Sequence, residues 1–148
     1  MHWTQGDYLL TDDRAKVDLG VVCFLLGGSY WASNRSPAVI ERSLAHSICF
    51  SLLHQQRQVG FGRIISDAAT FSYLCDVILH PDHRGKGIGK WMVRCILEHP
   101  QVCGTRVALF TKDAQGLYEQ FGFGKPPFDC LVRPADGTTK TGDLPAGQ

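Results

Sequence analysis

The residues best suited to chemistry lie between positions 80 and 90, where basic side chains alternate with glycines. Gly85, Gly87 and Gly89 are spaced by two, so a ligand could approach the backbone amides without meeting a Cβ atom. Free amides and the dipole of a following helix attract negative charge. Further positive charge comes from Arg84, Lys86 and Lys90. The stretch is therefore either a phosphate-binding loop or a basic connector without a ligand.

Two familiar phosphate-binding motifs do not match this loop. A Walker A sequence requires Ser or Thr after its Gly-Lys pair, but Trp91 follows Lys90. A dinucleotide-binding fingerprint that starts at Gly85 would need its third glycine at the position of Lys90. The pattern that fits is Arg-x-x-Gly-x-Gly, which the chain forms with Arg84, Gly87 and Gly89.

The elements on either side of the loop follow from the spacing of apolar residues. Residues 71–79 are apolar on both faces, which predicts a strand covered by helices on both sides, and Asp76 is the only acid in that strand. Apolar residues after the loop recur at helical spacing until Pro100, namely Ile88, Trp91, Met92, Cys95 and Ile96. The loop therefore joins a buried strand to an amphipathic helix.

A second candidate motif is DAQGLYEQFGF, residues 113–123. Gly122 can take the left-handed conformation that ends a helix. The stripe that this helix would bury consists of Ala114, Leu117, Tyr118 and Phe121. Tyr118 is either a functional phenol or a core tyrosine whose hydroxyl reaches the edge.

The two motifs together resemble, in the right order, those of the GCN5-related N-acetyltransferase (GNAT) family. The stretches SYWA-x-x-R at residues 29–35 and FxYLxDV at residues 71–77 resemble a bacterial subgroup of that family. The resemblance implies an α/β (α+β) fold with a mixed, splayed central sheet of six to seven strands and about four helices. We expect residues 1–132 to form this single domain, and residues 133–148, poor in apolar side chains, to form a disordered tail.

The remaining elements are predicted from periodicity, caps and turns. Ser36 before Pro37 marks a helix start, and that helix should end near His46. The other expected elements are a strand at 3–10, a helix at 18–29, hairpin strands at 48–52 and 59–65, a strand at 106–110 and a closing strand at 128–132.

The resemblance implies acetyl-coenzyme A as the co-substrate, with no metal. Backbone groups of the strand before the loop would pair with the pantetheine arm, at Val77, Ile78 and Leu79. The pyrophosphate would bind the amides of Gly85, Lys86, Gly87, Ile88 and Gly89, near the cations Arg84 and Lys90. Tyr118 matches the general acid that protonates the leaving thiolate. Thr111 stands where many members have an asparagine that touches the cofactor.

The base that accepts the amine's proton has several candidates. Many family members have a glutamate on the strand that here carries Asp76. Asp76 is either a general base, whose pKa burial would raise, or a structural carboxylate paired with Arg63. His80 and His83 are suitable bases by chemistry but lie beside the loop. A route in which water takes the proton stays open.

The segment between the first two predicted helices is where the family builds its acceptor site. Tyr30 and Trp31 could hold an amine against their faces, and Arg35 could bind a carboxylate. The alternative is a packed helical corner with Arg35 on the surface. The aromatic residues and the arginine therefore form a candidate acceptor wall.

The predicted function is direct transfer of an acetyl group from acetyl-coenzyme A to a primary amine in a ternary complex. The alternatives are another acyl donor, or a catalytically silent acyl-coenzyme A-binding or regulatory module of the same fold. The acceptor would be a small-molecule or peptide amine. A net charge of +1 suggests neither nucleic acid nor membrane as a partner, and edge strands could support a homodimer. Six cysteines without metal-ligand spacing predict buried, reduced thiols in a cytoplasmic protein.

Overall fold

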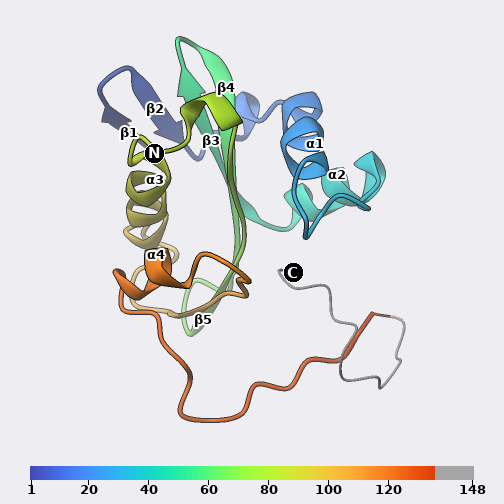
Figure 1. Ribbon diagram of the computed structural model, residues 1–148, viewed down its shortest axis with the longest axis vertical. Helices are drawn as coiled ribbons and strands as arrows, with labels where there is room; N and C mark the ends of the chain where they lie inside the picture. Colours follow the sequence, from blue (N-terminus) through green and yellow to red (C-terminus); the bar gives the residue numbers. More distant parts are fainter. Residues whose placement is uncertain (136–148) are drawn as a thin grey trace.

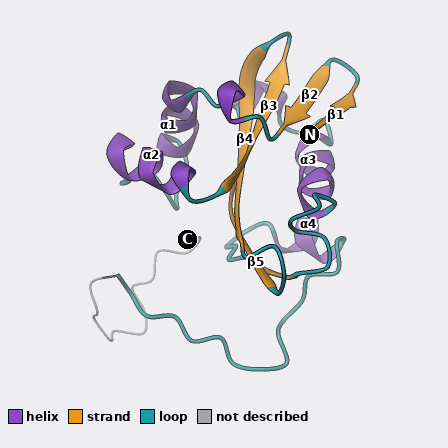
Figure 2. Ribbon diagram, turned by 180° about the vertical axis from the view of Figure 1, so that it is seen from behind, coloured by secondary structure: helices purple, strands orange, loops and turns teal. Residues whose placement is uncertain are grey.

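A mixed sheet with its strands in chain order separates two helical layers in the computed structural model, which describes residues 1–135 (Figures 1 and 2). All neighbouring strands are antiparallel except the last pair, which is parallel. The strands are β1 (His2–Gln5), β2 (Tyr8–Thr11), β3 (Ile48–His54), β4 (Arg57–Ser66), β5 (Phe71–Leu79) and β6 (Arg106–Ala108). The helices are α1 (Leu19–Gly27), α2 (Pro37–Ala45), α3 (Ile88–Leu97) and α4 (Gln115–Glu119), with short 3₁₀ turns η1 (Arg14–Lys16) and η2 (Pro81–His83). This confirms the expected fold class.

The two faces of the sheet bury separate apolar clusters. Helix α3 packs its stripe on one face, where the central buried residues are Phe50, Leu52, Ile64, Met92 and Ile96. Helices α1 and α2 cover the other face, where the cluster includes Val22, Leu26, Ile40, Phe61 and Ile78. Figure 1 shows α3 and α4 on one side of the strands and α1 and α2 on the other. Strand β5 is thus covered on both faces, as its apolar composition predicts.

Capping side chains fix where the first two helices begin. The Asp18 carboxylate accepts a hydrogen bond from the Val21 N–H at 3.1 Å, so α1 starts at Leu19. The Ser36 hydroxyl accepts one from the Val39 N–H at 3.3 Å, and proline occupies the first turn of α2. The predicted start of this second helix is confirmed.

The N-terminal region differs from the single predicted strand at 3–10. The chain turns back after Gln5, because Gly6 adopts a left-handed conformation with φ of 56°, and β1 and β2 form a hairpin. The turn between β3 and β4 is also shorter than predicted. It uses only Gln55 and Gln56, both with positive φ, so β4 already begins at Arg57.

The C-terminal side of the sheet also differs from the prediction. Strand β6 ends at Ala108 rather than at position 110, and residues 128–132 form no strand. Pro126 and Pro127 directly precede that segment and have no N–H to donate to a ladder. The sheet therefore has six strands in the described residues. The predicted tail lies largely outside them, and the domain boundary at 132 stays a prediction.

The cysteines correct the expectation of six buried thiols. All six are free, but only Cys49 and Cys95 are buried, while Cys103 and Cys130 are exposed. Within residues 1–135, no helix has the length and apolar character needed to cross a bilayer.

Tight packing between α3 and the sheet leads to a stability prediction for Gly62→Ala. A Cβ atom at position 62 would lie 2.7 Å from Met92 Cε and 2.8 Å from Ile96 Cδ1, so these side chains must shift. The free energy of unfolding should fall by about 1–3 kcal/mol in urea titrations. The control is Gly27→Ala, whose Cβ meets no atom within 4 Å at the end of α1 and should be neutral or slightly stabilising. Equal stability of both variants would contradict this packing.

Candidate functional site

The site begins where β5 and β6 separate. Their parallel pairing covers only Phe71 to Tyr73 on β5, opposite Arg106 to Ala108 on β6. Beyond this point the edge of β5 that faces away from β4 has no partner strand among the described residues, so backbone groups on that edge can pair with a ligand, although the Leu79 carbonyl already accepts from Arg84 Nε. The residues predicted to pair with pantetheine, Val77, Ile78 and Leu79, lie on this open part of β5.

A bulge in β5 sets the directions of the side chains beside the opening. Leu74 pairs with Ile64, and Asp76 pairs with Arg63, which leaves Cys75 as the extra residue. A bulge bends its strand and re-aims the side chains around it. Leu74 consequently packs in the α3 cluster, while Asp76 contacts the segment between α1 and α2.

Asp76 is fully buried and binds three donors from two other parts of the chain. The Arg63 guanidinium donates from Nε to Oδ2 at 2.7 Å, and Arg35 donates from Nη1 to both oxygens at 3.1 and 3.3 Å. The Trp31 indole donates to Oδ1 at 2.9 Å. The pairing of Asp76 with Arg63 that the sequence suggested is present, whereas its catalytic role stays a prediction. Arg35 was a candidate for binding the carboxylate of an acceptor, but its guanidinium binds the carboxylate of Asp76 instead.

A cavity of about 160 Å³, here called the Tyr118 cavity, lies beside the opening between β5 and β6. It is lined by Tyr30, Trp31, Leu74, Cys75, Asp76, Val77, Leu109, Phe110, Thr111, Asp113, Ala114 and Tyr118. Burial raises the pKa of the Tyr118 phenol, and neighbouring Tyr30 adds to that shift. The phenol is therefore protonated at neutral pH and can donate a proton to a stronger base. Thus Tyr118, Asp76 and the aromatic acceptor residues, predicted separately, lie around one cavity.

Tyr30 connects the acceptor segment to the loop before α4. Its hydroxyl accepts a hydrogen bond from the Lys112 N–H at 3.3 Å and donates one to the Asp113 carboxylate at 3.4 Å. In the same loop Thr111 Oγ1 accepts from the Ala114 N–H at 3.0 Å. The Thr111 hydroxyl therefore shapes the cavity wall, and its lone pairs are partly used within the protein.

The loop at residues 84–90 presents an uncapped helix start. Gly87 is the N-cap of α3 with φ of 75°, and no side chain caps the first turn, so the first N–H groups of α3 are free for an anion. Gly85 is also left-handed, with φ of 72°. A Cβ atom at either glycine would meet no protein atom within 4 Å, so the space above both is open.

The cations of this loop are exposed around the helix start. Arg84 donates from Nε to the Leu79 carbonyl at 3.0 Å, which fixes its stem against the end of β5. Lys86 donates to the Asp82 carbonyl at 2.9 Å, and Lys90 lies exposed on the first turn of α3. Their positive charge adds to the helix dipole without filling the anion position.

Some predicted residues are not at the Tyr118 cavity, and others there were not predicted. His80 and His83 line a different cavity, at the far end of β5. Leu109, Phe110 and Asp113 line the Tyr118 cavity but lie outside the predicted site. Asp113 is the first residue of the second sequence motif, so its position could have suggested a role. No short-range pattern identified Leu109 or Phe110.

The buried network of Asp76 predicts a large loss of stability in Asp76→Asn. Removing the carboxylate charge leaves two arginine cations without their partner, so the free energy of unfolding should fall by about 3–5 kcal/mol. Urea unfolding would measure the change. The control is Asp113→Asn, the exposed acid of the same cavity, which should change stability by about 0.5 kcal/mol or less. A small loss in both variants would show that the network contributes little.

Known proteins resemble the chain over most of its length. A solved structure from Xanthomonas campestris, assigned to the GNAT family, is 37% identical with a TM-score of 0.82, covering 88% of this chain and 94% of that one. A protein of Gibberella zeae assigned to the acetyltransferases is 32% identical over 139 residues, which is 79% of this chain and 78% of the relative.

At the level of the fold alone, a GNAT family acetyltransferase from Elizabethkingia anophelis, solved with acetyl-CoA bound, has a TM-score of 0.60 at 11% identity and covers 84% of this chain and 80% of its own. Residues 45–125, more than half of the chain, match the Acetyltransferase (GNAT) domain family. Together with the splayed sheet and the uncapped start of α3, this match shows that the chain belongs to the GNAT acetyltransferases.

Proposed function

We propose that this protein transfers the acetyl group of acetyl-coenzyme A directly to a primary amine within a ternary complex. The observation that carries the proposal is Tyr118, a protonated phenol in a cavity beside the open edge of β5. The free amides at the start of α3 lie at the other end of that open edge. An extended molecule with an anionic end and a reactive thioester suits this arrangement.

The cofactor would lie along β5 from the loop to the cavity. Its pyrophosphate would bind the amides of residues 85–89, with Arg84, Lys86 and Lys90 nearby. The pantetheine arm would pair with the backbone of residues 77–79, as an added strand does. Support comes from the open β5 edge and, for the fold alone, from the relative solved with acetyl-CoA.

In the chemical step the amine nitrogen attacks the thioester carbonyl, and the carbon–sulfur bond breaks. Tyr118 gives its phenolic proton to the leaving thiolate and regains one from solvent. The products are the acetylated amine and free coenzyme A. Tyr30, Trp31 and Phe110 supply aromatic faces against which the acceptor would lie.

We assign the proton lost by the amine to water rather than to Asp76. Both carboxylate oxygens of Asp76 already accept hydrogen bonds, from two guanidinium groups and an indole. Protonation there would weaken three contacts at once. Loss of the acid limb of the kcat/KM profile in Asp76→Asn would instead identify Asp76 as the base.

A covalent acetyl-enzyme is disfavoured by the state of the cavity's thiol. Cys75 lines the Tyr118 cavity, and burial raises its pKa to about 11. Only the thiolate is a strong nucleophile, so this cysteine is largely unreactive near neutral pH. Direct attack by the amine is therefore the simpler route.

The general-acid role predicts that Tyr118→Phe lowers kcat by about 100-fold or more while acetyl-CoA affinity stays the same. Because burial raises the pKa of Tyr118, the wild-type phenol should stay protonated near neutral pH, and no loss of kcat there should come from this group. Steady-state kinetics across a panel of amines would measure this. The control is Tyr73→Phe, a half-buried tyrosine on β5 that does not line the cavity. Equal kcat in wild type and Tyr118→Phe would exclude the role.

The cofactor assignment predicts that acetyl-CoA raises the melting temperature of wild type but not of Gly87→Glu. A ligand at about 100 times its Kd stabilises the native state by roughly 2.7 kcal/mol, and a carboxylate at position 87 would repel the pyrophosphate. The control is Gly6→Glu, at a glycine that also has a positive φ and no protein atom near its Cβ position but lies on the β1–β2 turn. No shift in wild type would reject the cofactor. A shift without turnover of any amine would favour the regulatory module.

A further inference from the structure

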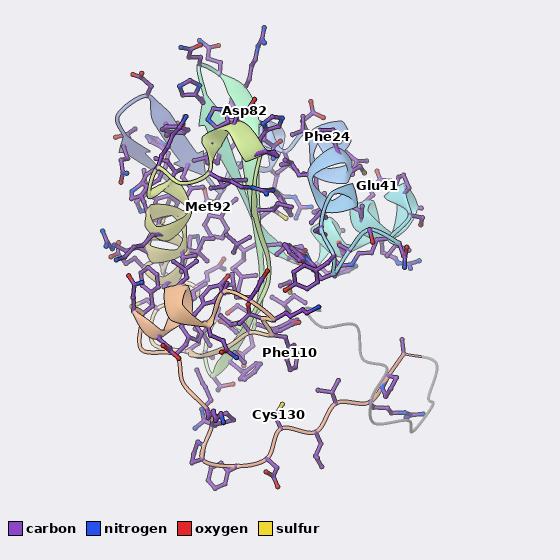
Figure 3. All side chains as sticks on the ribbon, in the orientation of Figure 1. Phe24, Glu41, Asp82, Met92, Phe110 and Cys130 are labelled. Carbon is purple, nitrogen blue, oxygen red and sulfur yellow. The ribbon has the colours of Figure 1, made fainter. Side chains whose placement is uncertain are left out.

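A second cavity, here called the end cavity, has a volume of about 560 Å³ and shares no lining residue with the Tyr118 cavity. It is lined by His54, Gln55, Arg57, Gln58, Val59, His80, Asp82 and His83. Figure 3 shows Asp82, which lines the end cavity, and Phe110, which lines the Tyr118 cavity, toward opposite ends of the sheet. The end cavity therefore needs an explanation of its own.

The turn η2 builds the end cavity by folding back over the end of the sheet. The His80 N–H donates to the Val59 carbonyl at 2.8 Å, which holds η2 on β4. His83 reaches β2, where its Nδ1 lies 2.8 Å from the Tyr8 hydroxyl. The rings of His54 and His83 have centroids 5.1 Å apart, and those of His80 and His83 are 6.1 Å apart. Three half-buried imidazoles thus gather from two separate segments.

The side chains around these imidazoles carry more positive than negative charge. Arg57 on β4 lines the cavity, and the Lys86 ammonium donates to the Asp82 carbonyl beside it. Asp82 supplies the only carboxylate of the lining, and it is exposed, with one oxygen 3.6 Å from His80 Nδ1. Partial burial lowers the pKa of His83, and the neighbouring cationic groups of His54, Lys86 and His80 lower it further. Negative charge bound beside His83 would therefore oppose the effect of these neighbouring groups.

The surroundings select an anion over a metal ion. Among the described residues, no three His, Cys, Asp or Glu side chains are placed to hold a metal. An oxyanion would accept hydrogen bonds from the Arg57 guanidinium and from imidazole N–H groups, and its charge would stabilise protonated imidazoles. A dianion suits the site better than a carboxylate because several donors converge from different elements.

We propose that the end cavity binds a divalent oxyanion, such as the phosphate of a phosphate monoester, and that binding draws protons onto His54 and His83. The site is separate from the amides of the 84–90 loop, so the proposal does not depend on the acetyl-transfer reaction. Affinity for the dianion increases as pH falls, because binding takes up protons.

Sulfate is the probe of choice, because its charge stays at −2 across the pH range in which histidine titrates. Calorimetry at constant ionic strength should give a Kd about tenfold tighter at pH 6 than at pH 8, which corresponds to uptake of about half a proton. In proton NMR near neutral pH, sulfate should move the imidazole signals of His54 and His83 toward those of protonated histidine and leave the signals of His46 unchanged. His46 lies at the end of α2 and does not line the cavity.

Two variants and a control locate the site. His54→Gln and His83→Gln should each weaken sulfate binding at pH 6 about tenfold, while His46→Gln should have no effect. Gly87→Glu, which repels anions from the 84–90 loop, should leave sulfate binding intact. Binding that is lost in Gly87→Glu, that is independent of pH, or that survives in both cavity variants would overturn the proposal.

The phosphate could come from a separate metabolite or from the 3′-phosphate of coenzyme A. Comparing coenzyme A with dephospho-coenzyme A distinguishes these sources. If the 3′-phosphate is the ligand, His54→Gln should weaken binding of coenzyme A but not of dephospho-coenzyme A. If a metabolite is the ligand, His54→Gln should affect neither cofactor, while sulfate still reports the site.

Discussion

The buried carboxylate of Asp76 is the constraint on which the site depends. A charge without water must have partners, and this one obtains them from β4 through Arg63 and from the α1–α2 segment through Arg35 and Trp31. Those contacts fix the segment that also carries Tyr30 against β5. The Asp76 contacts lie on the face of β5 that α1 and α2 cover, and they hold one wall of the Tyr118 cavity in place. The segment between α1 and α2 contains no helix, and its hydrogen bonds to the Asp76 carboxylate hold it in position.

The two faces of strand β5 and its open edge have different roles. Its faces are largely covered by α3 and by α1 and α2, and only residues 74–77 line the Tyr118 cavity. Its edge is freed because pairing with β6 stops at Tyr73, and the bulge at Cys75 re-aims the side chains at that point. The close fit of Gly62 beneath Met92 and Ile96 keeps the strand layer and α3 in register. Strand β5 is therefore held firmly between the two layers and keeps one open edge.

Short-range patterns predicted the elements whose signals are local. The helical spacing from Ile88 to Ile96, the Ser36 cap and the alternation in β5 each depend on neighbours within a few residues, and the structure confirms these elements. The β1–β2 hairpin was missed because Gly6 sits within an otherwise strand-like stretch. Arg63, which is 13 residues from Asp76, was predicted as its partner, but Trp31 and Arg35 lie 45 and 41 residues away, and no periodicity encodes such contacts or the position of Phe110.

The turn η2 links the two anion-binding regions that we propose. His80 and His83 face the end cavity, and Arg84, the next residue, anchors on the Leu79 carbonyl at the start of the 84–90 loop. An anion bound in the end cavity would contact η2, which leads directly into that loop. Thermodynamic linkage is reciprocal. If an anion in the end cavity changes the affinity for acetyl-CoA by some factor, acetyl-CoA changes the affinity for that anion by the same factor. Because protons accompany the anion, such coupling would make cofactor affinity depend on pH even though Tyr118 stays protonated near neutrality.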